Sequence, residues 1–162
     1  MSIYTKNGDA GLTDTIDRKN ISKSDLLIEL IGTIDELSSH LGLAKALLCG
    51  NIPAADIAKI QSTLSLLMGE LAGGKASIAT EDIQFLEKIC DRYCPEFPHK
   101  FILPGENAVS AQLDISRTVA RRAERIAVRS EINNKNILAY LNRLSDAIYA
   151  MARYSEKKES EI

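Results

Sequence analysis

The stretch DLLIELIGTIDELSSHLGLAKALL, residues 25–48, decides the fold of this chain. Its apolar residues recur in alternating steps of three and four, at Leu27, Leu30, Ile34, Leu37, Leu41, Ala44 and Leu48. This spacing places them on one side of an α-helix that Ser24 or Asp25 can cap. The helix is expected to end within residues 49–53, where a glycine and then a proline stop helical propagation.

Four more segments carry the same helical spacing. We expect Thr80, Asn107 and Asn136 to cap the third, fourth and fifth helices. The second helix is expected to stop at Gly73-Gly74, the third at Pro95 and Pro98, and the fourth at about Glu131. Residues 101–103 resemble a short strand, but no segment keeps a period of two. Five helices joined by short connections predict an all-α fold, an up-and-down five-helix bundle of the four-helix-bundle or ferritin-like type.

Length and composition limit the class of protein. With 162 residues, 45% of them hydrophobic, the chain fits a single domain (1–162), made of a loop region (1–23), a helical bundle (24–155) and a frayed tail (156–162). Twenty basic residues against 22 acidic ones give a net charge of -2, which favours neither nucleic acid nor a membrane as partner. The sequence shows no secretory signal, so a cytoplasmic location is expected.

The cysteines do not indicate a metal site. Cys49, Cys90 and Cys94 form no CxxC pair, and the sequence offers only His40 and His99 as further ligands. We therefore expect neither a disulfide framework nor a metal held by the protein alone. Buried apolar positions are the simpler interpretation of these cysteines.

A polar loop, TKNGDAG (residues 5–11), precedes the first helix and is followed by Thr13. Two glycines allow backbone N–H groups to converge on an anion, and Lys6 adds a positive charge. The spacing differs from that of a Walker loop, because no GK[ST] follows. Taken alone, the loop is more simply an ordinary solvated turn, since Asn, Gly and Asp are common turn formers.

The predicted fourth helix concentrates positive charge. Five arginines and one glutamate lie within thirteen residues: Arg117, Arg121, Arg122, Glu124, Arg125 and Arg129. Offsets of zero, four, seven and eight place four of them on one face, namely Arg117, Arg121, Glu124 and Arg125. Such a cluster repels itself unless carboxylates or a bound polyphosphate neutralise it. The alternative is a solvated face with Glu124 as an intrahelical partner.

Two other helices carry polar faces. On the predicted fifth helix, the polar stripe consists of Asn142, Ser145, Asp146 and Tyr149. These side chains can hydrogen-bond a sugar or base, or they only support the arginines. On the first helix, small residues form a second face: Gly32, Asp35, Ser39 and Gly42. Another helix can approach this face closely, and Asp35 would then need a cationic partner, which the arginines of the fourth helix can supply.

Together these segments resemble the PduO-type ATP:cob(I)alamin adenosyltransferases. The resemblance covers most of the chain, in the family's order and approximate spacing. It rests on YTKNGDAG (4–11), GTIDELSSHLGLA (32–44), FILPG (101–105), RTVARRAER (117–125) and YLNRLSD (140–146).

The resemblance implies a homotrimer with active sites between subunits. ATP, Mg²⁺ and cobalamin are the implied ligands, and a reductase and a cobalamin-dependent acceptor enzyme are the implied partners. The residues implied to hold ATP and its Mg²⁺ are Thr5, Lys6, Asn7, Gly8, Asp9, Gly11, Thr13, Lys23, Arg121, Arg122, Glu124, Arg125 and Asn142. Asp35 and Arg117 would pair across the subunit interface, and Phe101 would lie beneath the corrin ring. Arg121, Phe101, Asp35 and Arg117 are thus the candidate catalytic residues.

The implied reaction is attack of the cobalt of cob(I)alamin on the ribose 5′-carbon of ATP, with triphosphate as the leaving group. The arginines and Mg²⁺ would stabilise the leaving charge, and the reaction requires no general base. Phe101 would exclude the lower axial ligand of cobalt, although a simple core anchor is the alternative role for this side chain.

The chain departs from the family pattern at several positions. These are Glu106-Asn107 after LPG, Asp114 where a histidine is usual, Leu26-Leu27, Ser38 and a short charged tail. Glu106 and Asp114 favour an alternative function, that of a non-catalytic carrier or sensor of ATP or adenosylcobalamin. A purely structural helical oligomer is the third interpretation.

Overall fold

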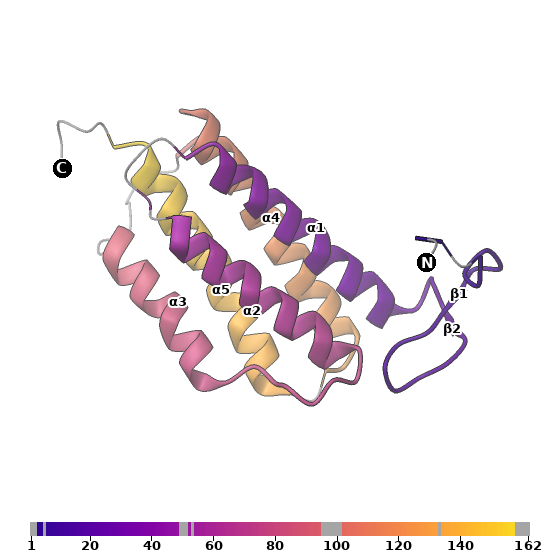
Figure 1. Cartoon of the computed structure of the whole chain (residues 1–162). Helices are drawn as coiled ribbons and strands as arrows, with labels where there is room; N and C mark the ends of the chain where they lie inside the picture. The colour runs from indigo at the N-terminus through magenta and orange to yellow at the C-terminus, as the bar shows by residue number, and fades with distance from the viewer. Residues whose placement is uncertain are drawn as a thin grey trace.

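The computed structural model describes residues 3–4, 6–48, 52, 54–94, 102–132 and 134–157. These residues form five helices and a short strand pair: β1 (Leu12–Thr13), β2 (Ile21–Ser22), α1 (Leu26–Ala46), α2 (Ala54–Leu71), α3 (Thr80–Tyr93), α4 (Ala108–Arg129) and α5 (Lys135–Ser155). Each helix runs opposite to the one before it (Figure 1). The predicted up-and-down five-helix bundle is therefore confirmed. No described helix is long and apolar enough to cross a membrane.

Two of the predicted helix caps are confirmed and two are wrong. Asp25 caps α1 by accepting the Leu27 N–H at 2.8 Å, and Asn107 caps α4. Asn134, rather than Asn136, caps α5, because its side chain accepts the Asn136 N–H at 2.9 Å. The N-cap of α3 is Ala79, not Thr80, and Asp82 compensates by accepting the Ala79 N–H at 3.1 Å.

The strand content also differs from the prediction. β1 and β2 pair antiparallel, with Leu12 opposite Ser22 and Thr13 opposite Ile21. Two-residue strands are too short to show alternation in the sequence. The strand expected at residues 101–103 is absent at Ile102 and Leu103. The expected stops at Gly50, Pro53, Pro95 and Pro98 lie outside the described residues, as does most of the tail.

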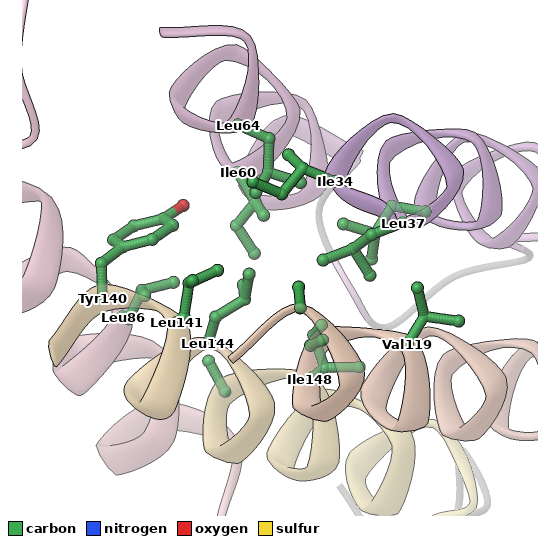
Figure 2. Packing of buried hydrophobic residues seen from close by; sticks show 14 of the residues in the cluster. Ile34, Leu37, Ile60, Leu64, Leu86, Val119, Tyr140, Leu141, Leu144 and Ile148 are labelled. Atoms are coloured by element: carbon green, nitrogen blue, oxygen red, sulfur yellow. The ribbon is translucent and has the colours of Figure 1, made fainter. Parts of the chain in front are cut away.

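All five helices contribute to one core (Figure 2). The predicted apolar side of α1 is buried from Leu27 to Ala44, and Leu48 beyond it is partly buried. Fully buried side chains from the other helices include Ile60, Leu64, Leu86, Leu141, Leu144 and Ile148. Burial of each large apolar side chain contributes about 1.5–3 kcal/mol, so this core holds α1 and α4 in a fixed relation.

Candidate functional site

A groove opens on the outer surface of the bundle, between the first turn of α1 and the second half of α4. It encloses about 720 Å³ and is lined by Glu29, Arg121, Arg122, Glu124, Arg125, Ile126, Val128 and Arg129. Four arginines against two glutamates give the groove a net positive charge. Such a groove suits a polyanion.

The arginines face outward because the two sides of α4 differ in composition. The core side consists of Val119, Ala120, Ala123, Ile126 and Ala127, all buried. Its alanines allow the neighbouring helices to approach closely. On the opposite side, Arg121 and Arg125 are exposed, as their predicted common face requires, and Arg122 beside them is exposed as well.

Paired residues recur along the outer line of contact between α1 and α4, which we call the α1–α4 seam. It consists of Glu29 with Arg129 at 3.6 Å, Glu36 in an ion pair with Arg122 and, one further step of seven residues along each helix, the exposed Leu43 and Ile115. The two ion pairs fix the antiparallel register, and a step of seven residues along each helix leads from one pair to the next. Glu36 was not among the predicted site residues, because the register between two helices is not a local property of the sequence.

Arg121 and Arg125 differ from the other arginines of the groove. Neither side chain has an ion pair or hydrogen bond with any described residue, whereas Arg122 and Arg129 are paired across the seam. Glu124, the expected intrahelical partner, forms no ion pair with a described arginine. The expected pairing of Glu124 with these two arginines is therefore wrong, although both side chains are exposed to solvent.

The N-terminal loop is closed by short-range hydrogen bonds. The Asp9 N–H donates to the Lys6 carbonyl at 3.3 Å, and the Gly11 N–H donates to the Gly8 carbonyl at 3.2 Å. Lys6 and Gly11 have positive φ angles of 66° and 79°. Gly11 adopts this conformation without the cost that a side chain would add.

Lys23, directly after β2, binds this loop. Its backbone N–H donates to the Gly11 carbonyl at 2.9 Å, and its ammonium donates to the Gly8 carbonyl at 2.8 Å. The predicted ATP contact Lys23 thus also supports the loop. Of the other predicted loop contacts, Lys6, Asn7 and Asp9 are exposed and Thr13 is partly buried, while Thr5 lies outside the described residues.

The loop and the groove lie at the same end of the bundle. The loop region projects from the end at which α1 begins and α4 terminates (Figure 1). Glu29, in the first turn of α1, lines the groove, and Asp25 joins that turn to the loop region. Convergence of both elements on one ligand stays a prediction.

The polar stripe of α5 is divided in the structure. Ser145 is buried and donates to the Asn142 carbonyl, while Asp146 accepts from Arg143 at 2.8 Å. Arg153 lies over the ring of Tyr149, and burial raises the pKa of this tyrosine. Asn142 itself is exposed.

Asn142 is placed near the arginines by the register of α5 against α4. The buried ion pair between Asp114 and Arg153 sets this antiparallel register. Equal steps along both helices then bring Asn142 level with Arg125. Asn142 does not line the groove itself, and its contact with ATP stays a prediction.

Asp35 and Arg117 are not paired within the protomer. Asp35 is exposed on α1, and the Arg117 Nε donates instead to Asp114 at 3.1 Å. Within one chain, Glu36 rather than Asp35 receives the cationic partner from α4. Pairing of Asp35 with Arg117 between subunits stays a prediction. Phe101 lies outside the described residues.

Asp114 has a clear structural role. The carboxylate is buried, with 4% of the residue exposed, and it binds both Arg117 and Arg153. Arg153 is also buried and reaches Glu156 at 3.1 Å. A buried guanidinium requires such a counter-ion, which explains an acidic residue at this position.

The described residues contain no cluster of three or more His, Cys, Asp or Glu side chains that can hold a metal ion. Glu29 and Glu124 provide carboxylate oxygens in the groove. Mg²⁺ is typically bound by one or two carboxylates together with substrate phosphates, so the groove fits a magnesium ion that arrives with a nucleotide.

The fold and the groove together define a helical protein suited to binding a polyanion. Residues 3–155 match the sequence model of the cobalamin adenosyltransferase family. A corrinoid adenosyltransferase of Citrobacter freundii is 39% identical, over 95% of this chain and 94% of that protein. One of Bacillus subtilis (strain 168) is 41% identical, over 94% and 86% respectively.

A solved structure supports the same assignment. A variant of the PduO-type ATP:corrinoid adenosyltransferase from Lactobacillus reuteri, complexed with cobalamin and ATP, superposes with a TM-score of 0.88. Its sequence is 34% identical, and the match covers 96% of this chain and 91% of that one. This chain belongs to the cobalamin adenosyltransferase family.

Proposed function

We propose that this chain transfers the 5′-deoxyadenosyl group of ATP to cob(I)alamin, forming adenosylcobalamin and triphosphate. Family membership over nearly the whole chain supports this proposal. The observation that carries it is the groove between α1 and α4, where Arg121 and Arg125 have no counter-ion among the described residues. Unpaired guanidinium groups are suited to a polyphosphate.

The reaction is a displacement at carbon. The cobalt of the substrate cob(I)alamin donates an electron pair to form a bond with the ribose C5′. The bond between C5′ and the triphosphate oxygen breaks, and triphosphate leaves with that electron pair. No side chain has to accept a proton. The protein's contribution is to hold the carbon in line and to stabilise negative charge on the leaving oxygen.

The residues of the groove and loop have distinct proposed roles. Arg121, Arg122 and Arg125 bind the triphosphate, and Glu124 helps to hold Mg²⁺ beside it. The loop residues Thr5, Lys6, Asn7, Gly8, Asp9, Gly11 and Thr13, together with Lys23 and Asn142, enclose the rest of the nucleotide. The position of the loop and groove at one end of the bundle supports this arrangement.

We propose a homotrimer in which each site lies between two subunits. Leu43 and Ile115, at one end of the α1–α4 seam, are 50% and 46% exposed, and exposed apolar residues suit a subunit contact. Asp35 is exposed on α1 and forms no ion pair with a described residue. In the trimer, Asp35 pairs with Arg117 of the partner subunit, which Asp114 already orients.

Phe101 is proposed to lie beneath the corrin ring, where an apolar side chain excludes the lower axial ligand and water. Phe101→Ala tests this role. We expect turnover to be lost while the Kd for ATP is retained. Loss of ATP binding instead would contradict the role, because it would place Phe101 at the nucleotide.

The deciding experiment mixes the protein with chemically reduced cobalamin and ATP and follows the corrinoid spectrum. An enzyme forms the light-sensitive adenosyl product, and Arg121→Ala is expected to lower its rate of formation by at least tenfold. Arg143→Ala is the control, because it removes a partly exposed arginine that lies outside the groove. Equal rates in both variants would contradict the assignment of the groove.

A non-catalytic carrier or sensor is the second candidate function. Glu106 favours it, because this exposed carboxylate precedes α4. Asp114 no longer favours it, since the buried pair with Arg153 accounts for that residue. The same spectroscopic assay separates the two functions, because a carrier binds ATP or adenosylcobalamin without forming product.

A further inference from the structure

The loop between β1 and β2 contacts the bundle at the end of α2, outside the residues that line the groove. This segment, residues 14–20, returns toward the end of α2 (Figure 1). The Ile16 N–H donates to the Ala72 carbonyl at 2.8 Å. The Asp17 side chain lies over Gly73, where a Cβ atom would come within 2.3 Å of its Cγ. Residue 73 therefore has to be glycine for Asp17 to occupy this place.

The end of α2 is a rigid support for this contact. The Gly74 N–H donates to the Gly69 carbonyl at 2.8 Å, and the Gly73 N–H donates to the Glu70 carbonyl at 3.0 Å, which is the bonding of a Schellman motif. Gly73 has the positive φ of 92° that this motif requires.

Glu70 ties the same helix end to its neighbours. Its carboxylate accepts the Ile78 N–H at 2.7 Å, ahead of α3, and the Asn134 side-chain amide at 2.6 Å, at the cap of α5. Three helix ends are thus joined at one carboxylate. The contact made by residues 14–20 is therefore with a part of the bundle that does not move independently.

The strand pair connects residues 14–20 to the polar loop. β1 begins directly after Gly11, and Lys23 follows β2 and bonds both Gly11 and Gly8. Two-residue strands do not hold a position by themselves. The location of the polar loop therefore depends on where residues 14–20 are anchored.

We propose that the Ala72–Gly73 end of α2 is the seat that positions the nucleotide-binding loop, with Ile16, Asp17 and Gly73 as positioning residues for ATP. The inference rests on the proposed function. ATP binds the seated loop, and a variant that unseats the loop has an apparent Kd raised by the inverse of the seated fraction. Because coupling is reciprocal, ATP in turn stabilises the seated state.

Two variants test the seat from its two sides. Gly73→Ala places a methyl group against Asp17 and strains the backbone. Ile16→Pro removes the N–H that bonds Ala72 and leaves the bundle untouched, so it remains informative if Gly73→Ala fails to fold. Gly69→Ala is the control, because a Cβ atom there meets nothing within 4 Å.

The readouts are the Kd for ATP by calorimetry and hydrogen exchange of residues 14–20 by mass spectrometry. We expect both variants to raise the Kd by about tenfold and to lose protection of residues 14–20 by a similar factor, with Gly69→Ala unchanged. The KM for ATP should rise more than kcat falls. The proposed seat is contradicted if the wild-type chain binds ATP and both variants bind it with a Kd within twofold of the wild-type value. It is also contradicted if both variants bind ATP while hydrogen exchange of residues 14–20 is unchanged. If the wild-type chain does not bind ATP, the proposed function itself is overturned.

Discussion

Glu36 of α1 forms an ion pair with Arg122 of α4, and the same contact recurs two helical turns away between Glu29 and Arg129. The α1–α4 seam thus occupies two of the four arginines of the groove with carboxylates before any ligand arrives. A triphosphate that binds Arg122 has to compete with Glu36.

Glu36→Gln is therefore expected to strengthen ATP binding. An exposed ion pair contributes about 0.2–1 kcal/mol, so its removal should lower the Kd by about 1.4- to fivefold at low salt. Calorimetric titration measures the change. Glu87→Gln is the control, since it removes a carboxylate 3.6 Å from Arg143 that lies away from the groove. Weaker ATP binding by Glu36→Gln would mean that Glu36 orients Arg122 instead of competing for it.

Arg125→Ala is expected to weaken ATP binding by about ten- to a hundredfold, because hydrogen bonds to charged groups contribute about 1.5–3 kcal/mol. The free energy of unfolding should change by less than about 0.5 kcal/mol, since the side chain is exposed and unpaired among the described residues. Arg125→Lys keeps the positive charge but not the planar fork of hydrogen-bond donors, so its Kd for ATP should lie between those of the wild type and of Arg125→Ala. An unchanged Kd in Arg125→Ala would exclude this residue from the triphosphate site.

Asp114→Asn is expected to destabilise the fold by about 3–5 kcal/mol, because it leaves Arg153 buried without its strongest counter-ion. Urea unfolding measures this loss. The double variant Asp114→Asn with Arg153→Met should recover a large part of it, because the buried charge is then absent. A single variant that loses less than about 1 kcal/mol would show that water or Glu156 compensates for the missing carboxylate.

Cys90 is expected to react slowly with alkylating reagents. Burial, followed by the nearby Asp146 carboxylate, raises the pKa of its thiol to about 11. At pH 8 only about one thiol in a thousand is then the reactive thiolate. Site-resolved mass spectrometry after iodoacetamide treatment, with the urea-unfolded protein as reference, measures the rate at this cysteine. Equal rates in the folded and unfolded chains would contradict the raised pKa.

The sequence predicted the bundle because helical spacing is a local property that each segment carries by itself. Asp25 and Asn107 were correct caps for the same reason. Asn136 was wrong because Asn134, two residues earlier, has an equally suitable side chain, and only the path of the chain into α5 selects between them. β1 and β2 were missed because their pairing depends on a contact across the loop between them.

The candidate site was predictable in part. The offsets along α4 placed Arg121 and Arg125 on one face, and both side chains are exposed in the structure. Their partners were not predictable, because Glu36 meets Arg122 only through the register between α1 and α4. Asp114 was recognised as a departure from the family pattern, but its reason, the buried Arg153, lies 39 residues away in the chain.

Arg121 and Arg125 also bear on how the protein is handled. Two guanidinium groups without carboxylate partners attract whichever multivalent anion the solution contains. Phosphate, sulfate or citrate carried over from purification occupies these groups and lowers the apparent affinity of a nucleotide added later. The apparent Kd for a nucleotide is therefore expected to depend on the buffer anion in which it is measured.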